Sequence, residues 1–295
     1  MIGFALPQFG TFGRQDLIQF ATSAERLGAG SLWVGDRLLA SVDPVTGVDG
    51  NAHIPRQFRR SFDPFVALSV AAAVTTTPLL GSSVLVAPWY PPVQFARQLT
   101  SIDVVSDGRL IAGLGIGWSP EEFEAAGASI GGRGAQLDEL LDVLDSVWTA
   151  APVRYAGRRW SMRPAWIDLK PAQKPHPPVY LSAFTPAALG RIGRRADGFL
   201  PVVRLPETQY VDEFRWQRQI IDSAAAAAGR DPAAVHTQVR VNVAHGTSIG
   251  EVADVVRKLA DNGFPDAFVD LMYVTSSVDE MIEWAQSLLS ARSRG

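Results

Sequence analysis

The sequence predicts an α/β fold in which eight parallel strands close into a single (β/α)8 barrel. Short apolar runs alternate with amphipathic segments through the whole chain, and eight such rounds are present. The 295 residues are 47% apolar, enough for one large core, so we expect residues 1–295 to form one domain. The expected strands are Ile2–Gln8, Ser31–Asp36, Leu80–Ala87, Leu110–Gly115, Val179–Ala183, Gly198–Val203, Gln238–Ala244 and Ala267–Tyr273.

The expected helices begin with residues that favour helix starts. One helix covers Asp16–Leu27, and Asp63 with Pro64 opens the next as N-cap and first residue. Ser277, followed three residues later by Glu280, has the capping-box pattern. These signals place helices between the strands, as a barrel requires.

The second of these helices, Phe65–Val74, is made almost entirely of Ala, Val and Leu. A helix on the outside of a barrel buries only one face, so this one has more apolar surface than a monomer covers. We expect a homodimer interface here, with a thick core as the alternative.

Composition argues against several classes of partner and chemistry. The net charge is −3 and no run of Lys and Arg is long enough to suggest a polyanion site, so we expect no nucleic-acid partner. No segment approaches roughly 18 apolar residues, and the chain starts as a strand without a basic leader, which predicts a cytoplasmic protein without a membrane partner. Cysteine is absent and the four histidines form no close pair, so we expect no metal site.

The segment Arg109–Phe123 is the strongest sign of a ligand site. It runs from a strand into Gly113, Gly115 and Gly117 and then into Trp118. Glycines at alternate positions are expected to leave one side of the strand end open to a flat ligand. A dinucleotide fingerprint is disfavoured, because it opens a βαβ unit and this segment lies mid-chain. Three acids that follow, Glu121, Glu122 and Glu124, are interpreted as ordinary helix-start residues.

Two connections are longer than usual barrel loops. Leu38–Phe62 follows the second strand and is expected to cover the barrel mouth as a lid. Ala151–Pro178 precedes the fifth strand, and its part Val153–Trp160 is expected to form a small hairpin.

Barrel enzymes place their chemistry at the carboxyl ends of strands, which directs attention to two further segments. Asp36 and Arg37 end the second strand, where they either form a salt bridge or contact a cofactor or substrate. Ser182–Thr185 ends the fifth strand, and Thr185 opens a helix whose N-terminus either binds an anion such as a phosphate or is merely capped. Arg191, Arg194 and Arg195 further along that helix are expected to be solvated or interfacial.

With these residues in place, the chain resembles the bacterial luciferase-like family of (β/α)8 flavin and deazaflavin oxidoreductases. The resemblance rests on Ile2–Pro7, Ser31–Arg37, Asp63–Phe65, Leu80–Val84, Gly113–Trp118 and Ala196–Phe199, which stand in the family's order and spacing. Within the family the chain looks most like the branch that uses coenzyme F420, whose members exchange a hydride at C5 of the deazaflavin with an organic substrate.

The resemblance also implies site residues. It identifies Asp36, Arg37 and Trp118 as candidate catalytic residues and implies a cis peptide bond at Ser83-Val84 beneath the cofactor ring. The candidate cofactor-binding residues are Asp36, Ser83, Val84, Gly115, Gly117, Trp118, Ser182, Ala183, Phe184 and Thr185.

The chain departs from several sugar-phosphate dehydrogenases of this branch, which carry His where it has Arg37 and Glu where it has Trp118. That argues against oxidation of a sugar phosphate with those acid/base residues. The leading hypothesis is an F420-dependent oxidoreductase acting on an unidentified small molecule. An FMN-dependent monooxygenase that uses reduced flavin and O2 is the alternative, and a cofactor-binding barrel without turnover is the third hypothesis.

Overall fold

A parallel barrel is also what the computed structural model contains. The structure describes residues 1–46 and 54–292. All strand pairs within the main sheet are parallel. Its strands are β1 Ile2–Ala5, β2 Ser31–Val34, β3 Leu79–Ser82, β4 Leu85–Val86, β5 Leu110–Gly115, β8 Val179–Leu181, β9 Gly198–Phe199, β10 Val202–Arg204, β11 His236–Thr237, β12 Val239–Asn242 and β13 Ala267–Asp270.

Three positions of the barrel are filled by two short strands each, so these 11 strands occupy eight positions. Strands β3 and β4 both pair with β5, β9 pairs with β11, and β10 pairs with β12. The path from β12 through β13, β1, β2, β3, β5 and β8 reaches β9, whose continuation β10 pairs again with β12. The ring of strands is therefore closed, and the prediction of a (β/α)8 barrel is confirmed.

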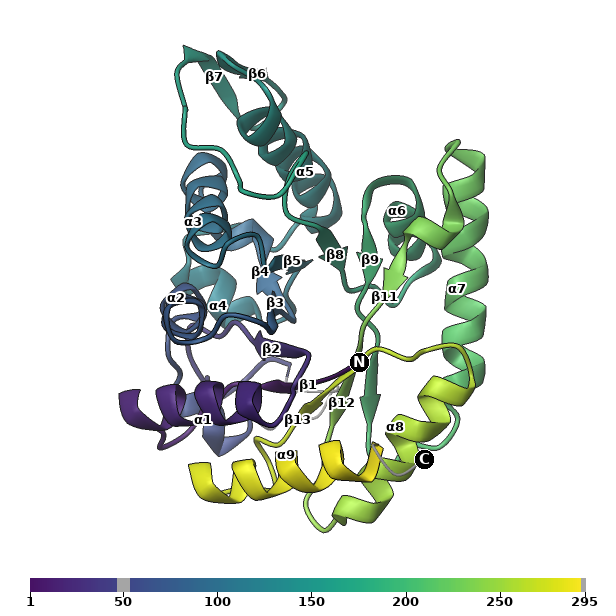
Figure 1. The fold of residues 1–295 in the computed structure, drawn as a ribbon. Helices are drawn as coiled ribbons and strands as arrows, with labels where there is room; N and C mark the ends of the chain where they lie inside the picture. The colour runs from purple at the N-terminus through teal and green to yellow at the C-terminus, as the bar shows by residue number, and fades with distance from the viewer. Residues whose placement is uncertain (47–53, 293–295) are drawn as a thin grey trace.

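The helices lie on the outside of the sheet (Figure 1). They are α1 Arg14–Arg26, α2 Pro64–Val74, α3 Pro92–Val105, α4 Pro120–Ala125, α5 Arg133–Thr149, α6 Pro186–Arg195, α7 Tyr210–Ala227, α8 Ile249–Asp261 and α9 Val278–Arg292, with short 3-10 turns η2 Arg56–Arg59, η3 Ala87–Trp89 and η4 Pro232–Ala234. Within the described residues, no helix is both long and apolar enough to cross a membrane.

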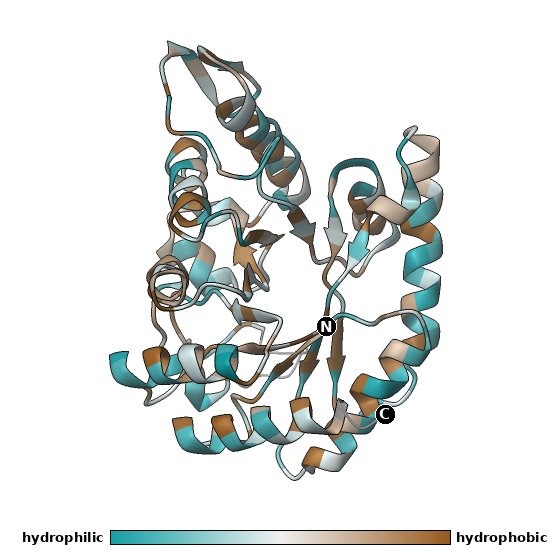
Figure 2. Ribbon diagram, viewed as in Figure 1, coloured by the Kyte–Doolittle hydropathy of each residue, from teal (hydrophilic) through white to brown (hydrophobic). Residues whose placement is uncertain are grey.

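The main core lies between the barrel and its helices, and a smaller cluster fills the barrel itself. In Figure 2 the strands are mainly brown, whereas the helices carry brown and teal stripes. Inside the barrel, the rings of Trp33 and Phe268 stack with centres 4.7 Å apart. A Cβ atom at Gly81 would lie 2.3 Å from the Trp33 ring, so this glycine makes room for the indole.

The helix-start predictions hold. Asp63 caps α2 by accepting hydrogen bonds from the backbone of Phe65 at 2.9 Å and Val66 at 3.0 Å. At α9, Glu280 N–H donates to Ser277 Oγ at 3.2 Å, as in the predicted capping box, and hydrogen bonds from Ser276 and from the Ser277 backbone to the Glu280 carboxylate lower its pKa. The Glu280 side chain reaches one residue further back, where it finds both an N–H and a hydroxyl donor.

Both long connections occur where the sequence predicts them. Strands β6 Val153–Ala156 and β7 Ser161–Ala165 form a hairpin that starts where we expected one but extends past Trp160, and it projects from the barrel beside α5 (Figure 1). The described parts of Leu38–Phe62 pack on the barrel mouth, since Phe62 N–H donates to Gln8 O at 3.0 Å and Val45 N–H donates to Glu121 at 2.6 Å.

Candidate functional site

A cavity of about 430 Å³ opens at the carboxyl ends of the strands. It lies where barrel enzymes hold their ligands. Of the predicted cofactor residues, all except Thr185 line it, and Arg37 does so too. The lining residues are Phe9, Gly35, Asp36, Arg37, Phe58, Ser83, Val84, Val86, Gly115, Ile116, Gly117, Trp118, Glu122, Arg133, Leu137, Leu181, Ser182, Ala183, Phe184, Ala188, Arg191, Arg204, Arg240, Asn242 and Tyr273.

Asp36 is held on the floor of this cavity by two hydrogen bonds. Its Oδ2 accepts from Val86 N–H at 2.9 Å and from Tyr90 Oη at 2.8 Å. The side chain is buried, and burial raises the pKa of Asp36 to about 6 in spite of those two hydrogen bonds. Asp36 therefore changes its protonation state much closer to neutral pH than an exposed aspartate does.

Arg37 forms a buried ion pair with Glu122, not with its neighbour Asp36. The distance from Arg37 Nη1 to Glu122 Oε2 is 3.1 Å, and the two side chains are only 8% and 1% exposed. Glu122 Oε1 also accepts from the backbone N–H of Leu38 at 2.8 Å. The interpretation of Glu122 as a plain helix-start residue is thus wrong, because its carboxylate turns inward from α4 to neutralise Arg37.

Two aromatic rings contact the Arg37 guanidinium. Its Cζ lies 4.6 Å from the centre of the Trp118 ring and 4.9 Å from that of Phe58, which belongs to the long loop. A cation close to aromatic rings is stabilised by their electron-rich faces. Together with Glu122, these contacts fix the position of Arg37 at the cavity wall.

The alternating glycines do not leave an open face, contrary to our expectation. A Cβ at Gly115 would lie 2.4 Å from Val84 Cγ2, and one at Gly117 would lie 2.5 Å from Val86 Cγ1. Strand β4 and the residues before it already fill this space, and Gly117 also has a positive φ of 67°. These glycines line the cavity, but they are required by close packing of the chain against itself.

The peptide bond between Ser83 and Val84 is cis, as the resemblance implies. Its carbonyl, Ser83 O, accepts a hydrogen bond of 2.8 Å from Arg240 Nη1. Arg240 Nη2 in turn donates to Asp270 Oδ2 at 2.5 Å. The ion pair between Arg240 of β12 and Asp270 of β13 thus anchors the backbone at Ser83, which follows β3.

The residues that lead into α6, and Arg191 within this helix, line the same cavity. Ser182, Ala183 and Phe184 line the cavity, whereas Thr185 caps α6 by accepting from Ala188 N–H at 3.4 Å. Arg191 also lines the cavity and is held by Asp138 through Nε at 2.7 Å and Nη2 at 3.1 Å. Of the two expectations for Arg191, solvated or interfacial, the first is wrong, because α6 packs this side chain against α5.

Arg133 and the polar residues of β12 are further lining residues that sequence reasoning missed. Arg133 donates to Gly117 O across the cavity edge. Arg240 and Asn242 alternate with Val239 and Val241 in β12. Such alternation signals a strand with one polar face, and in a barrel this face points inward near the mouth.

Several polar atoms of this cavity are buried without a hydrogen-bond partner among residues 1–46 and 54–292. They are Arg37 Nε and Nη2, Arg240 Nε and Asn242 Oδ1. Buried polar groups in proteins are normally paired, so each exception needs an explanation. Their grouping around one cavity, together with the arginines and the N-terminus of α6, fits a polar ligand with anionic groups. A flavin or deazaflavin with a ribityl phosphate is such a ligand.

Comparison with known proteins identifies the family. The family model described as luciferase-like monooxygenase matches residues 4–287. The chain belongs to this family. A protein of Mycobacterium tuberculosis (strain H37Rv) whose function is uncharacterized is 33% identical over 184 residues, 62% of this chain and 63% of its own length. The chain therefore matches less than two thirds of the length of that relative.

Relatives with functional names include enzymes that use F420. An F420-dependent glucose-6-phosphate dehydrogenase of Amycolatopsis mediterranei is 30% identical over 193 residues, 64% of this chain and 54% of that protein. Among solved structures, an F420-dependent secondary alcohol dehydrogenase in complex with an F420-acetone adduct has a TM-score of 0.78 at 16% identity, covering 99% of this chain and 98% of its own. A monooxygenase from Streptomyces bottropensis has a TM-score of 0.76 at 20% identity and covers 99% and 97%. These structural matches establish the shared fold.

Proposed function

We propose that the protein is an F420-dependent oxidoreductase that transfers a hydride between the deazaflavin C5 and a small organic substrate. The observation that carries the proposal is the cavity at the strand ends, where arginines converge with polar atoms that have no hydrogen-bond partner in the described structure. F420 is favoured over FMN because two relatives, 30% and 27% identical to this chain, are named as F420-dependent dehydrogenases. Bound F420 supplies the carbon that donates or accepts hydride, which amino-acid side chains do not provide.

In this proposal, different residues of the chain bind the phosphate, orient the ring and exclude water. The backbone at the start of α6, with Arg133 and Arg191, holds the phosphate, because helix N-termini and guanidinium groups both attract anions. Ser83-Val84 and Gly115–Trp118 flank the ring and fix its orientation. The described parts of the loop Leu38–Phe62 exclude water from the mouth.

Asp36 is the proposed proton-handling residue. Its pKa of about 6 and its hydrogen bond from Tyr90 keep both protonation states within reach near neutral pH. Arg37 cannot take this role because a guanidinium keeps its proton. We assign Arg37 to stabilising negative charge on the substrate, and Trp118 to positioning Arg37.

The test is a binding titration of the purified protein with F420 and with FMN, followed by the fluorescence of each cofactor. Tight binding of F420 with FMN left free supports the proposal. The opposite result moves the assignment to the FMN-dependent monooxygenase, and binding of F420 without turnover of any candidate substrate leaves the non-catalytic barrel.

A matched pair of variants tests the proposed phosphate end. Replacing Arg133 by Gln removes a cavity-lining guanidinium and is expected to weaken F420 binding by about tenfold to about a hundredfold, since a charge-assisted hydrogen bond contributes about 1.5–3 kcal/mol. Arg194→Gln changes an exposed arginine on α6 and is expected to leave binding unchanged. Equal affinity of the two variants would exclude Arg133 from the cofactor site.

We further propose that the protein acts as a cytoplasmic homodimer without nucleic-acid or membrane partners. Helix α2 supports the dimer: Phe65 and Leu68 face the core, whereas Val66 on the outer face is 54% exposed. An exposed apolar helix face is a common subunit interface.

A further inference from the structure

The guanidinium of Arg37 leaves one edge unused, and this edge has a defined geometry. Nη1 is taken by Glu122, while Nε and Nη2 have no hydrogen-bond partner in the described part of the chain. Nε and Nη2 lie side by side on the guanidinium and point two N–H groups in the same direction. This is the arrangement that binds both oxygens of a carboxylate at once.

Another arginine of the same cavity shows what this edge does when it is occupied. Arg191 holds Asp138 through the same two atoms, Nε at 2.7 Å and Nη2 at 3.1 Å. Arg37 and Arg191 have similar surroundings, since both side chains line the cavity and both are largely buried. The Nε/Nη2 edge of Arg191 is therefore satisfied by a carboxylate of the protein, whereas the same edge of Arg37 meets no acceptor among the described residues.

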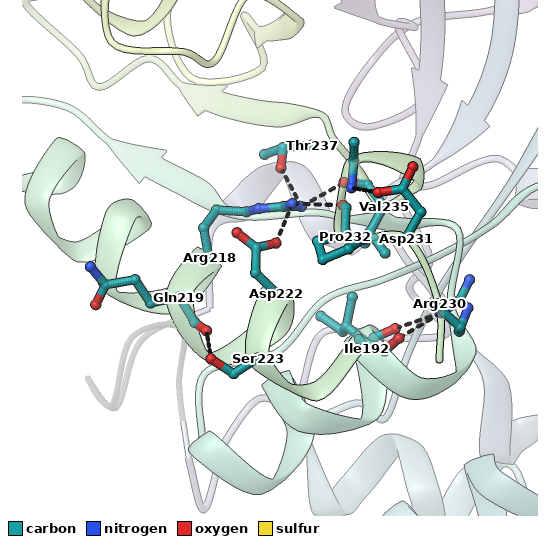
Figure 3. Close-up of polar contacts among 12 residues, drawn as sticks. Ile192, Arg218, Gln219, Asp222, Ser223, Arg230, Asp231, Pro232, Val235 and Thr237 are labelled. Carbon is teal, nitrogen blue, oxygen red and sulfur yellow. Dashed lines mark hydrogen bonds and ion pairs between the residues drawn. The ribbon is translucent and has the colours of Figure 1, made fainter. Parts of the chain in front are cut away.

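Arginines elsewhere in the fold show that an unused edge is not a general property of this chain. At the other end of the barrel, Arg218 lies in a shallow cavity and donates to Val235 O, Pro232 O and Asp222, as Figure 3 shows. Both of its terminal nitrogens have acceptors, so the Arg218 cavity offers no comparable site.

We infer that Arg37 is the substrate-binding residue of the cavity and that the substrate carries a carboxylate, bound in a fork by Nε and Nη2. The inference rests on the proposed function in placing the substrate here. Leaving two donors of a buried guanidinium unpaired is costly, and a substrate carboxylate removes that cost. A neutral substrate of the same shape removes less of it, so the site selects organic acids.

The surroundings of Arg37 indicate what else the substrate carries. Phe9, Phe58, Trp118 and Tyr273 line the same cavity and give its mouth an aromatic wall. Both free nitrogens are shielded from solvent in this arrangement, and Phe58 lies 4.9 Å from the guanidinium on a loop. An apolar or aromatic group next to the carboxylate fits this wall and takes the place of the Phe58 ring.

The test uses benzoate as the probe and benzamide as its neutral counterpart. Binding of each to the wild-type protein is measured by calorimetry, with and without saturating F420. The decisive variant is Arg37→Lys, which keeps a cation beside Glu122 but loses the fork. Arg215→Lys, at an arginine whose side chain is 55% exposed, is the matched control.

We expect the wild type to bind benzoate at least tenfold more tightly than benzamide. Arg37→Lys should lose at least tenfold in benzoate affinity, keep its affinity for F420 within twofold, and melt normally. Arg215→Lys should match the wild type in every measurement.

Three results would overturn the inference. The first is a wild-type protein that prefers benzamide or binds neither probe, and the second is a loss of benzoate affinity in Arg37→Lys no larger than in Arg215→Lys. The third is a loss of F420 affinity in Arg37→Lys equal to its loss of benzoate affinity, which would assign Arg37 to the cofactor. Failure of the wild type to bind F420 at all would refute the proposed function instead. The benzoate comparison on the protein alone would still decide the role of Arg37.

Discussion

Replacing Asp36 by Asn should change how the stability of the protein depends on pH. The side chain of Asp36 is 7% exposed, and burial raises its pKa from an ordinary value of 3.8 to about 6. This rise corresponds to about 3 kcal/mol between the two protonation states. An asparagine of the same shape still accepts hydrogen bonds from Val86 N–H and Tyr90 Oη but carries no charge.

The sign follows from linkage. A carboxyl with a raised pKa in the folded state contributes stability while it is protonated and loses that contribution as the pH rises through its folded pKa. Wild-type stability from Asp36 is thus fully present below about pH 4 and lost by about pH 7. The free energy of unfolding of Asp36→Asn minus that of the wild type should rise by about 3 kcal/mol over this range.

Urea unfolding at fixed protein concentration, followed by circular dichroism from pH 4 to pH 8, measures this difference. Other titrating groups cancel in it, because both proteins contain them. Asp212→Asn is the control, since the Asp212 side chain is 89% exposed and its difference curve should be flat. A difference for Asp36→Asn that is flat or falls with pH would show that the buried carboxyl is not destabilised by its surroundings.

Three further variants test packing, charge and assembly. Glu122→Gln should lower the free energy of unfolding by about 3 kcal/mol, because it leaves Arg37 buried without a counter-charge, whereas the exposed Glu124→Gln should change it by less than about 0.5 kcal/mol in the same urea titration. Gly117→Val should lower the melting temperature more than Gly127→Val; both glycines have positive φ, but only a side chain at Gly117 meets Val86, and equal losses would refute the clash. Val66→Glu should convert the dimer to monomer in light scattering, and a monomeric wild type would refute the interface.

The barrel was predictable from the sequence because its signals are local and repeated. Each strand is a short apolar run that must be buried on both faces, and each helix starts with recognisable residues such as Asp63 before Pro64. Errors are confined to strand ends and splits. The predicted strand Gly198–Val203 is two strands in the structure, β9 and β10, and Pro201, which has no N–H to donate to a neighbouring strand, marks the break between them.

The candidate site was only partly predictable, because its pairs join residues distant in sequence. Asp36 and Arg37 were found from their position at a strand end, but their partners Tyr90 and Glu122 are 54 and 85 residues away. The acids that follow Trp118 in the sequence are as typical of a helix start as of a buried counter-ion for Arg37. Only the direction of the α4 helix decides between them.

Arg240 and Asn242 did carry a usable signal, since their alternation with valines marks a polar face within an apolar strand. Sequence reasoning passed over this signal because it weighed the ends of strands and not the strands themselves. Gly117 illustrates the opposite error: its pattern was noticed and its cause misassigned. A glycine required by a neighbouring strand and one required by a ligand look alike until Val86 is placed beside it.

Asp36 and Arg37 are adjacent in sequence but have separate surroundings, and this separation has a chemical consequence. The Asp36 carboxylate is fixed by Val86 and Tyr90, whereas the Arg37 guanidinium is fixed by Glu122 and two rings. An arginine holds its charge at all accessible pH values, while Asp36 changes charge near pH 6. Loss of the Arg37 fork should therefore weaken carboxylate binding equally at every pH. Loss of the Asp36 carboxyl should instead remove any change in carboxylate binding near pH 6. Variants that change both properties together would show that the two residues act as one unit.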